Sequence, residues 1–108
     1  MKLWIIEYID CAHHLRGHTK CGFPHGHTYR VDVTLESSKK GDMIVDFAEF
    51  KKKVRAVLSK YDHRDWNKSL KVPTVENICA LLHKDISRSL RYKITVRVWE
   101  GINKWAEL

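Results

Sequence analysis

The stretch "HGHTYRVDVTLE", from His25 to Glu36, decides the fold. From Thr28 onward, apolar and polar side chains alternate, which is typical of a β-strand with one buried face. The apolar face carries Tyr29, Val31, Val33 and Leu35. The polar face carries Arg30, Asp32, Thr34 and Glu36. The alternation therefore predicts a strand over 28–36 that covers a core with one side.

Two helices are predicted downstream of this strand. Asp46 resembles a helix N-cap with Glu49 three residues later, and Thr74 resembles a second N-cap directly after Pro73. The first helix has apolar residues at helical spacing, namely Phe47, Phe50, Val54, Val57 and Tyr61. The second has an apolar stripe of Val75, Ile78, Leu82, Ile86 and Leu90, and Cys79 lies beside that stripe as a core residue.

Three further strands complete the prediction: Lys2–Asp10, Lys93–Glu100 and a short one within Ile102–Leu108. The element order is strand, strand, helix, helix, strand, strand. This order indicates an α+β fold, with a four-stranded antiparallel sheet and two helices on one of its faces. Residues 1–108 form a single domain. Because an open sheet leaves two edge strands unpaired, pairing with other subunits is expected.

Composition narrows the class of protein. The chain has 108 residues, of which 44% are apolar and 31% charged, as in a soluble globular domain, and no apolar run is long enough to cross a membrane. The charged N-terminus and three cysteines without a Cys-x-x-Cys motif favour the cytoplasm. The net charge of +7 is spread over separate elements. The favoured interpretation of this charge is that it lies on solvated helix faces. Attraction of a small polyanionic substrate ranks second, and binding of nucleic acid ranks third.

A possible metal site precedes the central strand. His25 and His27 are two positions apart on an extended chain, so both imidazoles point the same way, as two ligands of one ion must. His13, at the end of the first strand, offers a third nitrogen. Three imidazoles and one open position describe a catalytic zinc site. The alternative is a structural zinc site of four ligands, His18, Cys21, His25 and His27.

Two polar features stand apart from the metal-binding pattern. Asp62 and His63 follow the first helix, either as a polar loop or as an acid/base pair in which the carboxylate tunes the imidazole. In the alternation of 93–100, Glu100 falls on the same inward face as Ile94, Val96 and Val98, which is otherwise apolar. It marks either the end of the alternation or a carboxylate aimed at a buried partner, such as the donor edge of an amino-pyrimidine.

Together these segments resemble the family of 6-pyruvoyltetrahydropterin and 6-carboxytetrahydropterin synthases. The likeness runs in order through "CAHHL" (11–15), "CGFPHGH" (21–27), "VDFAEF" (45–50), Asp62-His63 with Asn67, "PTVEN" (73–77) and Glu100. The matching segments cover nearly the whole chain. Trp66 and Gly101 depart from the family pattern, at positions that bear on the pterin pocket.

The resemblance implies the tunnelling fold, in which two trimers stack into a homohexamer with active sites between subunits. It implies that His13, His25 and His27 bind Zn²⁺. Cys21 would accept a proton, with Asp62 and His63 as its acid/base partners. Glu100 would anchor the pterin ring, and Thr74 is a further candidate for contacting it. The partners would be a small pterin triphosphate and other copies of the chain, with neither nucleic acid nor membrane.

The resemblance also implies the reaction. A spacing of three residues between Cys21 and His25 is similar to that of the 6-carboxytetrahydropterin synthases of queuosine and archaeosine biosynthesis. These zinc-dependent lyases convert 7,8-dihydroneopterin triphosphate to 6-carboxytetrahydropterin, acetaldehyde and triphosphate. The alternatives are 6-pyruvoyltetrahydropterin synthase, which omits the carbon–carbon cleavage, and a structural zinc module without activity. A related group that cleaves dihydroneopterin lacks the cysteine, so Cys21 argues against that activity.

Overall fold

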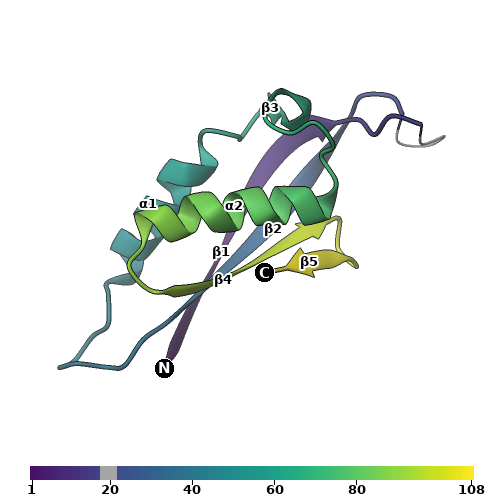
Figure 1. Cartoon of the computed structure of the whole chain (residues 1–108). Coiled ribbons are helices and arrows are strands. Elements are labelled where there is room, and N and C mark those ends of the chain that lie inside the picture. The colour runs from purple at the N-terminus through teal and green to yellow at the C-terminus, as the bar shows by residue number, and fades with distance from the viewer. Residues whose placement is uncertain (18–21) are drawn as a thin grey trace.

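The computed structural model describes residues 1–17 and 22–108 and shows an α+β fold with two helices (Figure 1). The strands are β1 (Lys2–His13), β2 (His25–Glu36), β3 (Arg64–Asp65), β4 (Lys93–Glu100) and β5 (Trp105–Glu107). The helices are α1 (Phe47–Leu58) and α2 (Val75–Ser89), with a short 3-10 turn at Trp66–Lys68. The sheet order is β3-β1-β2-β4-β5.

The predicted four-stranded antiparallel sheet is wrong by one strand. The additional strand, β3, lies between the two helices in the sequence and pairs in parallel with β1, through Cys11 opposite Arg64 and Ala12 opposite Asp65. The other strand pairs are antiparallel. A strand of two residues is too short to show any hydrophobic period, so the sequence pattern does not reveal it.

The long hairpin of β1 and β2 is the centre of the sheet. Its register runs from Lys2 opposite Glu36 to His13 opposite His25. Both strands therefore extend three residues further towards their connection than the alternation predicts. The apolar residues of the predicted inward face of β2 are fully buried: Tyr29, Val31, Val33 and Leu35.

Both predicted helix caps are confirmed. The Asp46 carboxylate accepts a hydrogen bond of 2.7 Å from the Ala48 N–H, and the Thr74 hydroxyl accepts one of 3.2 Å from the Asn77 N–H. The first helix ends at Leu58, so Tyr61 lies in the following turn rather than on the helix. Its ring stacks on that of Trp66, with 5.1 Å between centroids.

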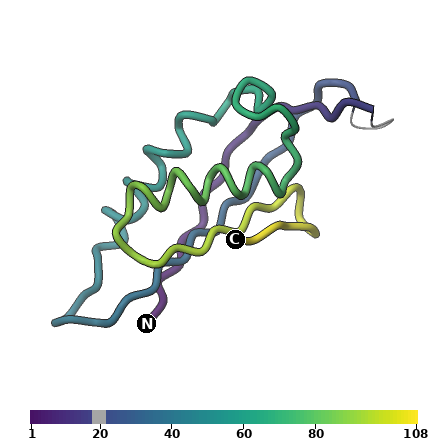
Figure 2. The backbone as a smooth tube through the Cα atoms, viewed as in Figure 1, coloured from purple at the N-terminus to yellow at the C-terminus, as the bar shows by residue number. Residues whose placement is uncertain are grey.

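The two helices cover the same face of the sheet (Figures 1 and 2). On the opposite face, three large aromatic residues are exposed, Trp4, Tyr8 and Trp105, and a fourth, Trp99, is half-buried. There the buried Asp32 carboxylate accepts hydrogen bonds from the Trp99 indole at 2.7 Å and the Arg30 guanidinium at 2.9 Å. Among the described residues, neither helix is long and apolar enough to span a membrane.

Candidate metal centre

Three histidines meet at the end of the β1–β2 hairpin. His13 is the last residue of β1 and lies opposite His25, the first residue of β2, and His27 follows on the same face. Their ring centroids are 4.5 Å apart for His13 and His25, 4.9 Å for His13 and His27, and 4.7 Å for His25 and His27. One nitrogen of each imidazole lies within 4.8 Å of one nitrogen of the others. The predicted grouping of the three is therefore present in the structure.

Hydrogen bonds orient two of these rings. Nδ1 of His13 lies 2.9 Å from the carbonyl oxygen of Pro73, and Nδ1 of His25 lies 2.8 Å from that of Phe23. Since a carbonyl can only accept, each Nδ1 carries a proton, and Nε2 is the ring nitrogen that remains to bind a metal. A metal-binding histidine usually donates its other ring N–H in this way, which fixes the orientation of the ring.

The donor set fits a divalent metal such as zinc. Nε2 of His13 and Nε2 of His27 are buried and have no hydrogen-bond partner among residues 1–17 and 22–108. Leaving a buried polar atom unpaired costs about 1–3 kcal/mol, and a metal ion would satisfy both atoms. Burial lowers the pKa of His27, against the raising influence of Glu100, while His13 and His25 lower it further. The ring is thereby kept in the neutral form that binds metal.

Glu100 lies beside this group, as its inward parity predicts. It ends β4 opposite Tyr29, and its side chain is only 16% exposed. Its carboxylate lies 3.8 Å from Nε2 of His27 and 3.4 Å from Nζ of Lys104. The contact with His27 is too long for a hydrogen bond. Both contacts are made by Oε1, so Oε2 can accept donors from a ligand.

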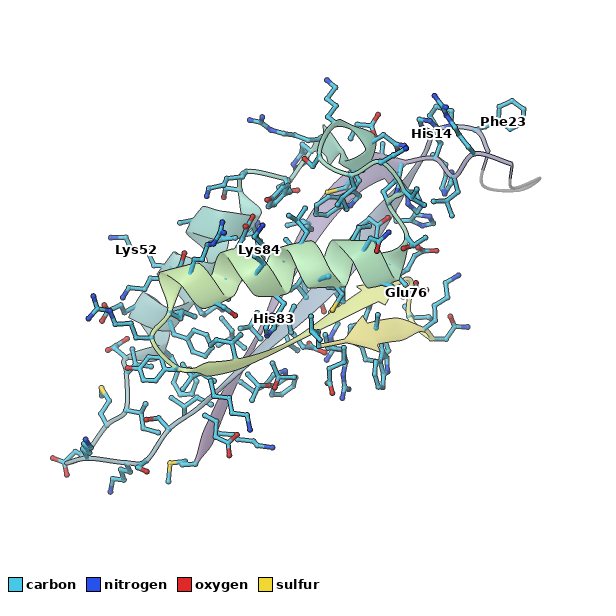
Figure 3. The ribbon with its side chains drawn as sticks, in the orientation of Figure 1. His14, Phe23, Lys52, Glu76, His83 and Lys84 are labelled. Atoms are coloured by element: carbon cyan, nitrogen blue, oxygen red, sulfur yellow. The ribbon has the colours of Figure 1, made fainter. Side chains whose placement is uncertain are left out.

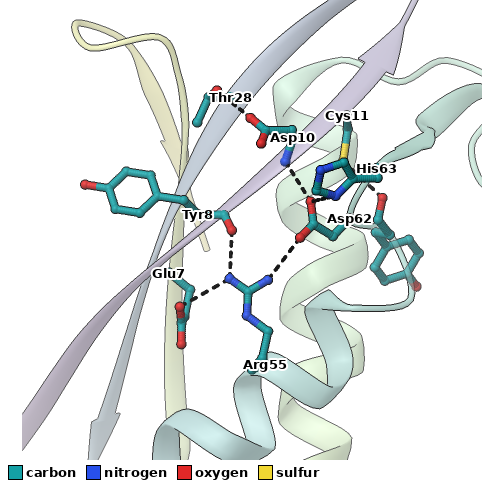
Figure 4. A network of polar contacts seen from close by, with 9 residues as sticks. Glu7, Tyr8, Asp10, Cys11, Thr28, Arg55, Asp62 and His63 are labelled. Atoms are coloured by element: carbon teal, nitrogen blue, oxygen red, sulfur yellow. Dashed lines mark hydrogen bonds and ion pairs between the residues drawn. The ribbon is translucent and has the colours of Figure 1, made fainter.

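The Asp62–His63 pair is present at the edge of β1 (Figure 4). Nδ1 of His63 lies 3.0 Å from the Asp62 carboxylate, which also accepts a hydrogen bond of 2.9 Å from the Asp10 N–H. His63 adopts a left-handed backbone conformation with a φ of 60°, held by a 2.7 Å hydrogen bond from its N–H to the Asp10 carbonyl. Such backbone strain is common at functional sites. The imidazole is 78% exposed, so it is open to solvent or a ligand.

Within one chain, the pair and the three histidines form two separate clusters. Both His63 and His27 line a broad depression of about 790 Å³, which also includes Arg64 and Lys68. A ligand in this depression could therefore contact the edge of the metal site and the acid/base pair together.

Two residues support these clusters through contacts that the sequence does not reveal. Arg55 of α1 contacts the carboxylates of Asp62 at 3.3 Å and Glu7 at 3.2 Å, and donates to the Tyr8 carbonyl at 2.7 Å. Asn67 belongs to the motif pattern, but its role emerges only here. Its side chain accepts from the His14 N–H at 2.9 Å and donates to the His14 carbonyl at 3.1 Å.

The remaining candidates are placed as follows. Cys21, the predicted proton acceptor, lies outside the described residues. The Thr74 hydroxyl caps α2, and Thr74 lines a second hollow beside His14. Cys11 is buried in the core, where its thiol donates to the Tyr61 carbonyl and burial raises its pKa to about 12. Trp66, a departure from the family pattern, is buried in the core.

Comparisons with known proteins agree with this architecture. The chain is 36% identical to the "Putative 6-carboxy-5,6,7,8-tetrahydropterin synthase" of Archaeoglobus fulgidus, over 100% of this chain and 95% of that protein. It is 34% identical to the "Dihydroneopterin monophosphate aldolase" of Pyrococcus furiosus, over 78% of this chain and 76% of that protein.

Solved structures share the fold. The 6-pyruvoyl tetrahydropterin synthase of Caenorhabditis elegans matches with a TM-score of 0.86 at 22% identity, over 100% of this chain and 94% of that chain. A variant of the Plasmodium vivax enzyme matches with a TM-score of 0.85 at 19% identity, over 100% and 96%. The sequence model described as "6-pyruvoyl tetrahydropterin synthase" matches residues 2–108. This chain therefore belongs to the 6-pyruvoyl tetrahydropterin synthase family.

Proposed function

We propose that the protein is a zinc-dependent 6-carboxytetrahydropterin synthase. It would convert 7,8-dihydroneopterin triphosphate and water to 6-carboxytetrahydropterin, acetaldehyde and triphosphate. The observation that carries the proposal is the group of His13, His25 and His27, in which two buried nitrogens have no partner in the described part of the chain and His27 lies beside the carboxylate of Glu100. The relative from Archaeoglobus fulgidus, matched along the whole chain, supports this reaction over others in the family.

Each residue has a stated task in this mechanism. His13, His25 and His27 would hold the zinc ion, which when bound supplies Lewis-acid stabilisation of charge on the side-chain oxygens of the substrate. Glu100 would accept hydrogen bonds from the amino-pyrimidine edge of the pterin and so orient it. Its burial at the end of β4 makes these charge-assisted bonds strong.

Proton transfer is assigned to the cysteine and to the Asp62–His63 pair. Cys21, as a thiolate, would remove a carbon-bound proton next to the pterin, and His63 would return a proton elsewhere on the substrate. The Asp62 carboxylate accepts from Nδ1 of His63, which fixes the ring and leaves Nε2 as the exchanging atom. Thr74 stays a candidate for contacting the pterin ring through its hydroxyl, which also caps α2.

The active assembly is proposed to be a homohexamer of two trimers, located in the cytoplasm, with sites between subunits. The sheet is open, and its edge strands β3 and β5 leave backbone groups with which neighbouring subunits can pair. Light scattering should give six times the 12.7 kDa mass of one chain. A monomer at micromolar concentration would contradict this assembly.

One second candidate has specific support. The Pyrococcus furiosus relative is named for cleaving dihydroneopterin monophosphate, so an aldolase activity must be tested. Product analysis under anaerobic conditions separates the reactions. Acetaldehyde with 6-carboxytetrahydropterin supports our proposal, and 6-pyruvoyltetrahydropterin identifies the other synthase. Cleavage of the monophosphate alone identifies an aldolase, and no turnover of any pterin leaves a structural zinc module.

The role of Cys21 is tested by Cys21→Ala. The variant should keep its zinc and lose about 10²–10⁴-fold in turnover, as expected for a missing general base. Cys79→Ala serves as the control, because Cys79 is buried in the core and hydrogen-bonds to the Val96 carbonyl. Loss of zinc in Cys21→Ala would instead show that the cysteine is a metal ligand.

A further inference from the structure

A hollow of about 460 Å³ lies between the segment that follows β1 and the turn that precedes α2. Its charged lining residues are Arg16 and Lys71, and His14 and Thr74 contribute polar groups. None of the described residues that line it is Asp or Glu. We refer to it as the basic hollow. Its volume falls within the range of small-molecule sites, about 300–1,000 Å³.

Charge distinguishes the basic hollow from the larger depression beside His63. In that depression, the cationic residues Arg64 and Lys68 are accompanied by Asp10 and Asp65. The opposite charges there largely cancel, whereas the basic hollow keeps an uncompensated positive potential. An anionic group is therefore attracted to the basic hollow more strongly than to the depression.

The basic hollow adjoins the metal centre through both of its walls. His14 directly follows His13, and Thr74 directly follows Pro73, whose carbonyl oxygen holds Nδ1 of His13. The His14 backbone is fixed by the two hydrogen bonds to Asn67. Two lining residues of the basic hollow are therefore sequence neighbours of residues that form or support the metal centre.

His14 adds an unused polar group. The Asn67 amide nitrogen lies 3.5 Å from Nε2 of His14, and this contact favours a proton on Nδ1. That nitrogen is buried and has no hydrogen-bond partner among the described residues. An imidazole N–H among the lining residues adds a donor to a site for a polyanion.

We propose that the basic hollow binds the phosphate tail of the substrate, with Arg16 and Lys71 as its cationic contacts. This inference rests on the proposed function, since it assigns the part of the same site that receives the leaving group. Arg can contact two phosphate oxygens at once, and Lys supplies a compact charge. A triphosphate carries more charge than a monophosphate, so the basic hollow favours the longer tail.

Binding of inorganic triphosphate, measured by calorimetry, tests the proposal without any turnover. Arg16→Gln and Lys71→Gln should each weaken the affinity roughly tenfold, and the double variant more. Lys52→Gln is the matched control, because Lys52 lies on α1 at the other end of the molecule from His14 (Figure 3). Chelation of a metal by triphosphate would be the same in all variants. Equal affinity in wild type and both single variants would overturn the proposal.

Kinetics provide the second arm. With 7,8-dihydroneopterin triphosphate, Arg16→Gln and Lys71→Gln should raise KM about tenfold and change kcat less than twofold. Arg16→Lys should recover part of the loss. Affinity for dihydroneopterin, which lacks phosphate, should not change. An equal loss of affinity for dihydroneopterin would contradict the assignment. A wild-type protein without turnover would refute the proposed function, while the calorimetry would still decide the role of the basic hollow.

Discussion

Removing the guanidinium of Arg55 should destabilise the protein by about 2–3 kcal/mol. Arg55→Met keeps an unbranched apolar stem but deletes the contacts to Glu7, Asp62 and the Tyr8 carbonyl (Figure 4). A hydrogen bond to a charged group contributes about 1.5–3 kcal/mol when buried. The side chain of Arg55 is 35% exposed, so solvent screening reduces each contact to about 1 kcal/mol.

Most of this loss of stability comes from the two carboxylates that Arg55→Met leaves without their cation. Glu7 and Asp62 are only 17% and 22% exposed, so both would be left partly buried with fewer partners. The Oδ1 atom of Asp62 would keep the Asp10 N–H and His63, but its Oδ2 would have no remaining partner among the described residues. We therefore expect turnover to fall together with stability, while metal content stays unchanged.

Thermal and urea unfolding measure this loss of stability. All variants are compared at one protein concentration, because the apparent stability of an oligomer depends on concentration. The expected fall in Tm is on the order of 10 °C. Lys53→Met on the same helix is the control, because its pair with Glu49 is exposed and worth at most about 0.5 kcal/mol. If Arg55→Met were as stable as Lys53→Met, the network would not hold the pair in place.

Four further outcomes are expected. His27→Ala should lose most of its zinc, and His14→Ala should keep it; full zinc retention in His27→Ala, measured by atomic absorption, would refute the assignment. Glu100→Gln should weaken binding of a pterin analogue by roughly 1–3 kcal/mol in calorimetry without changing zinc content, because an amide donor would face ring donors. Burial raises the pKa of Cys79 and raises that of Cys11 from 9.0 to about 12, so neither thiol should react with a disulfide reagent at pH 8. Cys11 ionises at a lower pH in the unfolded chain than in the folded protein. The stability should therefore fall as the pH rises from 9 towards 12, which melting curves would show.

The sequence was sufficient where the signal is local. Alternation in β2 predicts both the buried face and the direction of the two imidazoles of His25 and His27, since every second residue of a strand shares a face. The caps Asp46 and Thr74 are identifiable for the same reason, because each acts on a backbone N–H two or three residues away. The inward position of Glu100 follows from the alternation of its strand.

The sequence was insufficient where partners are distant along the chain. The pairing of β3 joins Cys11 to Arg64, and the Asn67 contacts reach back to His14. Neither leaves a periodic pattern in its own segment. Arg55 resembles any solvated helix cation until the fold places β1 beside it. Such side chains are assigned only after the elements have been assembled.

The position of all three imidazoles on one hairpin has a consequence for the order of folding. His13 and His25 are the final pair of the β1–β2 register, and only the segment 14–24 closes the loop between them. Contacts so close in sequence form early, whereas the carbonyl of Pro73 and the carboxylate of Glu100 arrive with later elements. A slip of one residue in β2 would turn His25 and His27 to the opposite face. An ion captured by three imidazoles during zippering would therefore select the correct register before either helix docks.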